Sequence, residues 1–220
     1  MITAYRNTEA RVVEVVRTLG PEAERAPVPS CPAWQVHDLL AHMVGIPAAL
    51  AAGHYPTGDL DAWLASLVAD RRDRSPAELI DEWSQCDAGV EPILGTEGLL
   101  LVDLVVHESD LRGALGRPGA RDADEVAFVL PLILRSLAPR LLAAGLGAIT
   151  VEAAGESWRS HEAEAGWTLL VDPWEATRLL ESRRTVAELL AAPARGDATP
   201  YVAVLDAHLP LPPRSLHEVG

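Results

Sequence analysis

Apolar residues recur at helical spacing through the first two thirds of this chain, and strand-like runs take over after residue 146. The spacing predicts helices over residues 5–19, 32–44, 60–68, 76–90, 98–115 and 124–144. Further along it predicts strands over residues 148–152, 167–171 and 201–205, and helices over residues 173–181 and 185–190. This order indicates a mainly α protein, with an up-down helical bundle over residues 1–146 and a small α/β domain over residues 147–220.

Local signals predict where several of these helices begin and end. Residues 75–78, Ser-Pro-Ala-Glu, form a capping box with proline at the first helical position. Gly116 is a typical residue for the end of a helix. Pro32 suits a first helical turn, so Trp34, Asp38 and His42 are expected one turn apart on a single helix face.

The composition excludes several classes of function. All 18 basic residues are arginine, so no lysine is present to form a Schiff base or to complete a Walker A phosphate loop. A formal net charge of −14 argues against a nucleic-acid partner. Two cysteines, a charged N-terminal segment and the lack of a long uncharged apolar run predict a cytoplasmic protein without a membrane span. Abundant Ala, Leu, Arg, Gly and Pro without Lys suggests a GC-rich bacterial source.

One helix pattern points to a metal site. His107 follows Asp103 by four residues, so both side chains leave the predicted helix on one face. Asp103 is the only charge in an apolar stretch, and a buried carboxylate needs a cation, a hydrogen-bond network or solvent. With His42 as a third ligand, a divalent ion would keep an open position, as catalytic zinc does. Spacing alone leaves a hydrogen-bonded Asp–His pair and a satisfied core His42 as alternatives.

Two segments of the chain resemble a known family. The stretches CPAWQVHDLLAH and VDLVVHESDLRGALG are similar to two helical motifs of the mycothiol-dependent maleylpyruvate isomerase family, within the DinB-like superfamily. Residues 155–216 resemble that family's sterol-carrier-like C-terminal domain, through Ser182-Arg183, Gly196-Asp197 and LPLPP. The family is actinobacterial in character, since mycothiol is its thiol cofactor.

The resemblance implies a DinB-like four-helix bundle that binds a divalent metal, usually zinc, through His42, Asp103 and His107. It also implies that mycothiol binds at the open metal position, where its thiolate attacks a small electrophile. The expected activity is therefore that of an isomerase or an S-transferase. A metal-dependent hydrolase and a non-catalytic small-molecule binding protein are the alternatives, and the protein is expected to be a monomer or a homodimer.

The chain departs from the family pattern at two positions. The family's isomerases carry Glu where this chain has Asp103, a change that zinc binding tolerates more readily than substrate choice does. The family commonly has Gly-Arg where Ser182-Arg183 stands. Arg183 is a candidate clamp for a substrate carboxylate, and Arg184 is an equal candidate. The alternative is a helix-surface ion pair with Glu181 or Glu188.

Other residues near the two motifs have candidate roles. Asp110 could orient the His107 ring from outside the metal's ligand shell, or be a surface acid. Trp34 could pack in the core or form a wall of the cofactor site, and Arg112 could bind an acidic cofactor group. Asp38 is the base that the hydrolase alternative would need. Cys31 is expected to be a helix cap or a small core residue, with a nucleophilic role as the alternative.

Overall fold

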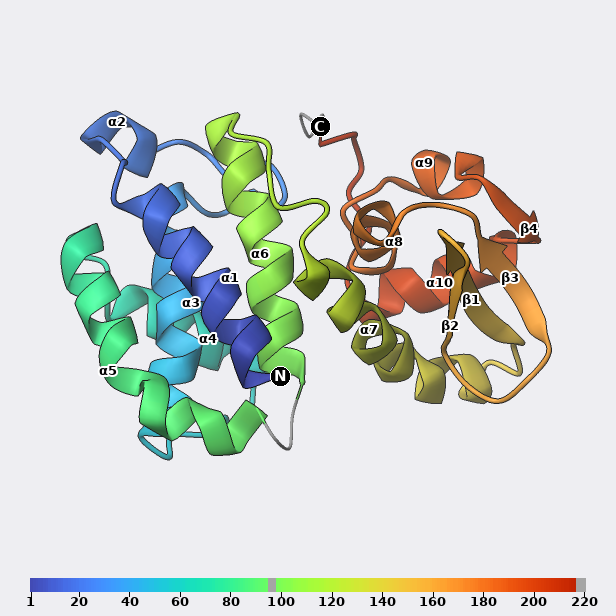
Figure 1. The fold of residues 1–220 in the computed structure, drawn as a ribbon, viewed down its shortest axis with the longest axis horizontal. Coiled ribbons are helices and arrows are strands. Elements are labelled where there is room, and N and C mark those ends of the chain that lie inside the picture. Colours follow the sequence, from blue (N-terminus) through green and yellow to red (C-terminus); the bar gives the residue numbers. More distant parts are fainter. Residues whose placement is uncertain (95–97, 217–220) are drawn as a thin grey trace. The chain divides into compact units, whose positions relative to one another are not determined.

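A computed structural model of the chain describes residues 1–94 and 98–216, with only the backbone described at residues 87 and 88. The chain divides into two compact units, the first running from Met1 to Gly119 and the second beginning at Ala120. The first unit is a helical bundle and the second a small α/β domain (Figure 1), which confirms the predicted fold class.

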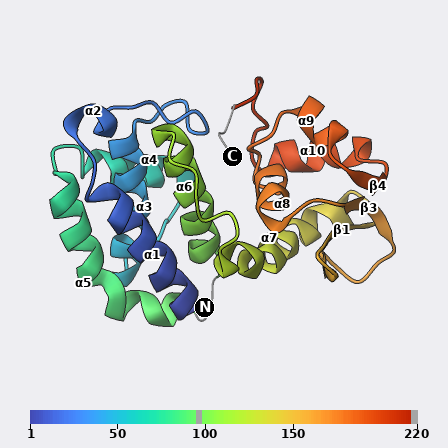
Figure 2. The same ribbon diagram turned by 45° about the horizontal axis from the view of Figure 1, so that its top comes forward.

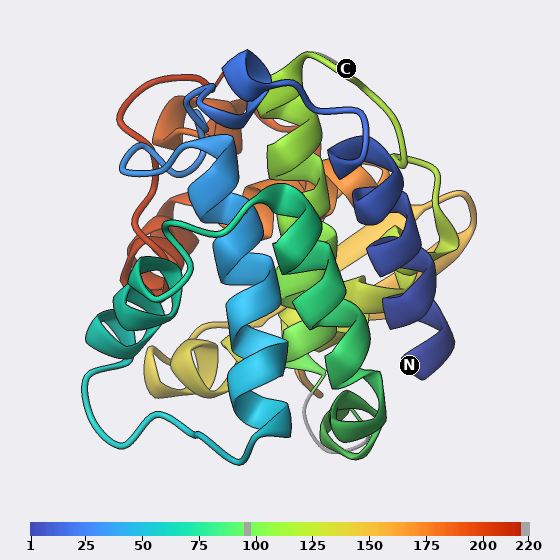
Figure 3. The same ribbon diagram turned by 90° about the vertical axis from the view of Figure 1, so that its left-hand side faces the viewer.

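Four helices form the bundle of the first unit: α1 (Ile2–Val16), α3 (Val36–Ala51), α5 (Pro76–Leu94) and α6 (Leu99–Leu115). Both α1 and α3 pack against α5 and α6, and Figure 3 shows the four helices side by side. The short helices α2 (Pro21–Glu24) and α4 (Leu60–Ala69) pack against α3. In the core, the indole N–H of Trp83 donates a hydrogen bond to the Tyr5 hydroxyl at 2.8 Å, so two large buried side chains join α1 to α5.

The ends of two bundle helices follow the sequence signals. The Glu78 carboxylate accepts from the Ser75 backbone N–H at 2.7 Å, and the Glu78 N–H donates to the Ser75 hydroxyl, so the capping box is formed. Gly116 adopts the left-handed conformation (φ 60°) that ends α6.

The predicted start of the second helix at Pro32 is wrong, because α3 begins at Val36. Residues 27–35 form a closed loop instead, in which Pro27 pairs with Gln35 and the Val28 N–H donates to the Trp34 carbonyl at 3.0 Å. The Val36 N–H donates to the Ala26 carbonyl at 2.9 Å. The backbone before Val36 therefore pairs with the preceding segment and does not form a helical turn. Trp34 therefore does not share a helix face with His42.

The second unit begins with a long helix and continues as a small sheet with helices. Its elements are α7 (Asp124–Ala143), β1 (Ala148–Ala153), β2 (Glu156–Arg159), β3 (Ala165–Leu169), α8 (Pro173–Leu180), α9 (Val186–Ala191), β4 (Ala194–Gly196) and α10 (Thr199–His208). The strand order is β2-β1-β3-β4, with β1 parallel to β3 and the other pairs antiparallel. Figure 2 shows β1, β3 and β4 together, with α8 and α10 beside them.

The predicted strand over residues 201–205 is wrong, because this segment lies in α10. Tyr201, Val204 and Leu205 are buried, at the i, i+3 and i+4 spacing of a helix face. The last strand of the sheet is β4, a three-residue segment that pairs with β3. A short apolar run is compatible with a strand or with a buried helix. Here the buried residues follow the spacing of a helix.

The division between the units precedes α7, whereas the sequence pattern places the boundary at residue 146. α7 packs against α8, α10, β1 and β2, so it belongs to the core of the α/β unit. By length and composition α7 is also apolar enough to cross a membrane. Its residues Val129, Leu130 and Ile133 are fully buried inside the protein, which is the arrangement of a core helix.

Candidate metal centre

The three predicted metal ligands lie together between two bundle helices. α3 supplies His42, and α6 supplies Asp103 and His107 from consecutive turns. Asp103 Oδ1 lies 3.2 Å from His42 Nε2 and 3.4 Å from His107 Nε2. One potential ligand atom from each residue lies within 4.8 Å of the other two. We call these three residues the His-Asp-His cluster.

The electrostatics of this cluster are dominated by its carboxylate. Burial by itself would raise the pKa of Asp103, but the charges of His107 and His42 outweigh burial and hold that pKa well below its usual value. Burial would lower the pKa of His107, but the Asp103 carboxylate and the hydrogen bonds around the ring raise it well above the usual value.

Asp110 supports the His107 ring from the other side. Its Oδ2 lies 2.8 Å from His107 Nδ1, and its side chain is completely buried. A carboxylate in this position fixes the ring so that Nε2 faces Asp103. The structure thus places Asp110 where an outer-shell residue of a metal site would lie.

The loop before α3 covers the two imidazoles. The Trp34 ring lies 4.7 Å from the His42 ring and 6.3 Å from the His107 ring, measured between centroids. The Trp34 N–H donates to the Cys31 carbonyl at 2.8 Å, and this turn brings Cys31 to the centre as well. Potential ligand atoms of Cys31, His107 and Asp110 all lie within 4.8 Å of one another. We call this second group the Cys-His-Asp cluster.

The residues of the His-Asp-His cluster fit a divalent ion. Two imidazole nitrogens and one carboxylate oxygen form a typical ligand set for zinc and related ions. His42 is 3% exposed, and its Nδ1 has no hydrogen-bond partner among the residues that the structure describes. The nitrogen of His42 that faces Asp103 is Nε2, so the unpartnered Nδ1 lies on the other side of the ring and would not be the atom that binds the ion.

Two further candidates have other contacts. The Asp38 carboxylate accepts from the Gln35 N–H at 3.0 Å and so caps the start of α3. Arg112 pairs with the buried Glu108, with Nη2 3.0 Å from Oε1, and Arg11 of α1 binds the same carboxylate at 2.8 Å. The structure therefore uses Asp38 and Arg112 to hold helices, and a role in cofactor binding or base catalysis stays a prediction.

The arginine pair of the second unit also has internal partners. The buried Arg183 donates from Nη1 to the Glu181 carbonyl at 2.6 Å. Arg184 makes a two-bond ion pair with Glu175, at 2.8 and 2.7 Å. Ser182 has a positive φ of 59°, a conformation that glycine adopts without strain. The proposed carboxylate clamp stays a prediction.

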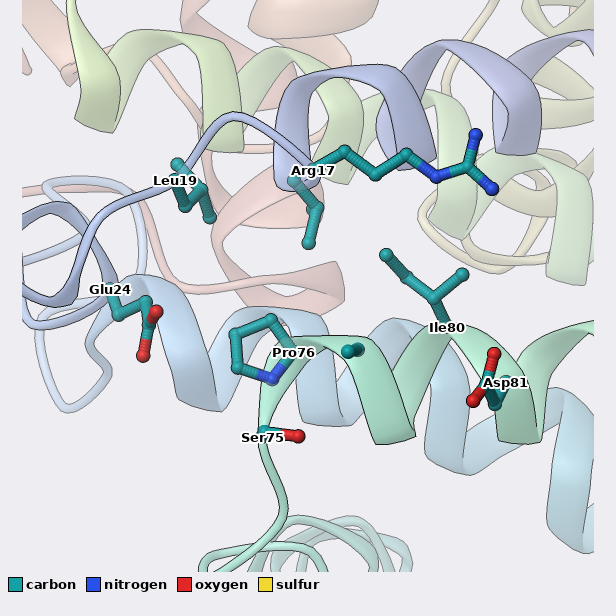
Figure 4. Close-up of a pocket in the computed structure, with 9 residues that line it drawn as sticks. Arg17, Leu19, Glu24, Ser75, Pro76, Ile80 and Asp81 are labelled. Carbon is teal, nitrogen blue, oxygen red and sulfur yellow. The ribbon is translucent and has the colours of Figure 1, made fainter.

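A cavity of about 370 Å³ lies elsewhere in the first unit, between the end of α1, α2 and the start of α5. Figure 4 shows its apolar residues Leu19, Pro76 and Ile80 together with the charged Arg17, Glu24 and Asp81. None of its lining residues belongs to either cluster.

Sequence reasoning found the His-Asp-His cluster but missed the position of Cys31. The turn that brings Cys31 to His107 has the sequence Ser-Cys-Pro-Ala-Trp, a pattern that also predicts the start of a helix. Proline two residues after Ser30 is a turn signal as well as a first-turn helix residue, and the turn formed here.

Comparison with known proteins supports the family resemblance. Residues 5–91 match the family model described as the mycothiol maleylpyruvate isomerase N-terminal domain. The matched range includes the Cys31–Trp34 turn and all of α3, and it ends before α6. Comparison with curated protein sequences and with solved structures gives no match.

Proposed function

We propose that this chain, whose residues 5–91 belong to the mycothiol maleylpyruvate isomerase N-terminal domain family, is a metalloenzyme that uses mycothiol on a small electrophilic substrate. The observation that carries the proposal is the convergence of His42, Asp103 and His107 from two helices. The finer parts of the proposal are that the metal is zinc, that the reaction is isomerisation or S-transfer, and that the protein acts in the cytoplasm as a monomer or homodimer.

The charges of the cluster favour an anionic sulfur ligand. A bound divalent ion would lower the pKa of a coordinating thiol, so that the thiol is a thiolate nucleophile at neutral pH. Two neutral imidazoles and the Asp103 carboxylate compensate only one of the ion's two positive charges. The remaining positive charge, in a largely buried site, attracts an anion more strongly than it attracts a neutral group.

The surrounding residues position the ligands and shield them. Asp110 lies 2.8 Å from Nδ1 of His107 and so orients the ring with its Nε2 toward Asp103. Trp34 covers one side of both imidazoles, so it keeps water from that side and offers an apolar wall to a thiol cofactor. Arg183 is our candidate for binding a carboxylate of the substrate.

The structure gives the hydrolase alternative less support. A metal-dependent hydrolase needs a base close to the attacking water, and Asp38 is the residue that the sequence offers. The Asp38 carboxylate is engaged with the Gln35 N–H at the start of α3. We therefore favour thiol chemistry.

Metal affinity and thiol consumption test this proposal. The untagged protein is assayed for bound metal, and its affinity for Zn²⁺ is measured by competition with a chelating indicator. We expect the substitutions His42→Ala, Asp103→Ala and His107→Ala each to weaken binding by more than about 100-fold, because loss of an outer-shell partner alone costs about 10–100-fold. His54→Ala, which changes an exposed loop histidine, is the matched control.

Each variant is also made with Cys31→Ser, because Cys31 lies beside His107 and could retain metal. Unchanged affinity in all three variants of this background contradicts the metal site. With metal bound, mycothiol and a bimane electrophile should form a thioether faster than without protein. Absence of thiol consumption with a broad panel of electrophiles contradicts the thiol chemistry and leaves the metal site standing.

A further inference from the structure

The two clusters share one side chain, His107, and each of its ring nitrogens has a carboxylate beside it. Nε2 lies 3.4 Å from Asp103 Oδ1, and Nδ1 lies 2.8 Å from Asp110 Oδ2. Cys31 completes the group on the Asp110 side, and its thiol also hydrogen-bonds to the His107 ring. The structure therefore surrounds this imidazole with potential metal ligands on both sides.

The Cys-His-Asp cluster has the composition of a metal site in its own right. Ligand bonds of about 2.0–2.3 Å place tetrahedral N, O and S donors about 3.5 Å apart, and the three donors here lie within 4.8 Å of one another. His107 is 8% and Asp110 1% exposed, whereas Cys31 is partly exposed, so an ion could enter from the Cys31 side. A thiolate donor favours soft and borderline ions such as Zn²⁺ over hard ions such as Mg²⁺.

We infer that Cys31, Asp110 and Nδ1 of His107 form a second metal position, and that it is occupied in alternation with the His-Asp-His position. This inference goes beyond the proposed function, with which it shares only the metal centre.

The alternation follows from the chemistry of one imidazole. A neutral ring offers a lone pair on one nitrogen and a proton on the other. An ion on Nε2 leaves Nδ1–H to donate to Asp110, and an ion on Nδ1 leaves Nε2–H to donate to Asp103. Each arrangement satisfies the carboxylate that does not bind metal. The ion thus exchanges between a position with an internal thiolate and a position without one.

The test uses Co²⁺ alone as the probe, with no thiol added, because a thiolate–Co²⁺ bond gives a charge-transfer absorption band in the near ultraviolet. Asp103→Ala removes a ligand of the His-Asp-His cluster and leaves Cys31, His107 and Asp110 in place. We expect this variant to bind one Co²⁺ and to show the band. The band should disappear in Asp103→Ala/Cys31→Ser and persist in Asp103→Ala/Cys86→Ser.

Cys86 is a matched control, because its thiol is buried on α5 and donates to the Glu82 carbonyl at 3.1 Å. If Asp103→Ala does not fold, His42→Ala serves in its place, since it also leaves the Cys-His-Asp cluster intact. Wild-type protein should bind one Co²⁺ per chain in total.

Three results would overturn the inference. These are a missing charge-transfer band in both single variants, a band that survives Cys31→Ser, and two Co²⁺ ions bound to one wild-type chain. The proposed function fails in a different way, when Cys31→Ser protein, which keeps the His-Asp-His cluster, binds no Co²⁺. Each idea can therefore be refuted without the other.

Discussion

Asp110→Asn is the substitution that most directly tests how the metal centre is held. Asparagine keeps the shape of the side chain, and its carbonyl can still accept from Nδ1–H of His107, but the negative charge is lost. In the native protein the Asp110 carboxylate is completely buried and lies 2.8 Å from that nitrogen, a length typical of a charge-assisted hydrogen bond. No solvent screens the interaction, so the loss of charge should have a large effect.

Outer-shell substitutions of this kind reduce metal affinity by about 10–100-fold, or about 1.4–2.7 kcal/mol. Because Asp110 is fully buried, we expect a value near the upper end. Affinity for Co²⁺ is measured by competition with a chelating indicator in the Cys31→Ser background. This background removes the thiol of the Cys-His-Asp cluster, so that the measurement reports the effect of Asp110 on His107 as a ligand of the His-Asp-His cluster. The ligand-field spectrum shows whether the coordination geometry has changed.

Asp38→Asn is the matched control for this experiment. It removes the charge of an acid at the start of α3, the helix that carries His42, and that acid accepts a hydrogen bond from the Gln35 N–H as a helix cap. We expect a small loss of stability and unchanged Co²⁺ affinity. If Asp110→Asn changes affinity by no more than the control does, the argument that Asp110 positions His107 is wrong.

Three further predictions concern the stability of the two units. Glu108→Gln should lower the free energy of unfolding of the bundle, measured by urea unfolding, by about 3 kcal/mol, because a side chain that is 3% exposed loses its ion pairs with Arg11 and Arg112; a loss below about 1 kcal/mol contradicts this. Gly166→Ala should lower the free energy of unfolding by about 1–3 kcal/mol, because a Cβ there meets the Tyr201 hydroxyl; Tyr201→Phe should recover part of the loss, and no recovery contradicts the clash. Burial alone would raise the pKa of Glu188, but the hydrogen bonds that its carboxylate accepts outweigh burial and lower this pKa. The ionised carboxylate therefore stabilises the fold fully above about pH 4.5, and this stabilisation is lost as the pH falls through the lowered pKa. Glu188→Gln should therefore flatten the acid side of the stability profile, and an unchanged slope contradicts the assignment.

The bundle could be predicted from sequence because its helices are long and rich in apolar residues at helical spacing. α5 begins at its capping box, and α6 ends directly before its terminal glycine. The four-residue spacing of Asp103 and His107 on α6 was enough to place both side chains on one face. The partner of that pair on another helix, His42, came from the family resemblance, because no local pattern states which helices pack together.

The errors arose where local signals were ambiguous and tertiary contacts decided. The turn at Cys31 carries a proline that is compatible with a helix start, and its actual hydrogen bonds run to Val28 and Trp34. The segment 201–205 is rich in strand-forming residues, and its buried positions nevertheless follow helical spacing. β2 has four mostly polar residues that give no strand pattern in the sequence, and its strand conformation depends on pairing with β1.

The division of the chain before α7 has a consequence for how such proteins can diversify. Every residue of both clusters lies in the first 119 residues, while α7 completes the core of the second unit. The joint between them, around residues 116–123, includes positive φ angles at Gly116, Gly119 and Ala120, and no buried strand or helix crosses it. Recombination at this joint would exchange the whole α/β unit, together with its helix, without opening the core of the bundle. The proposed metal site and the α/β unit that follows it therefore lie on separately exchangeable segments of the chain.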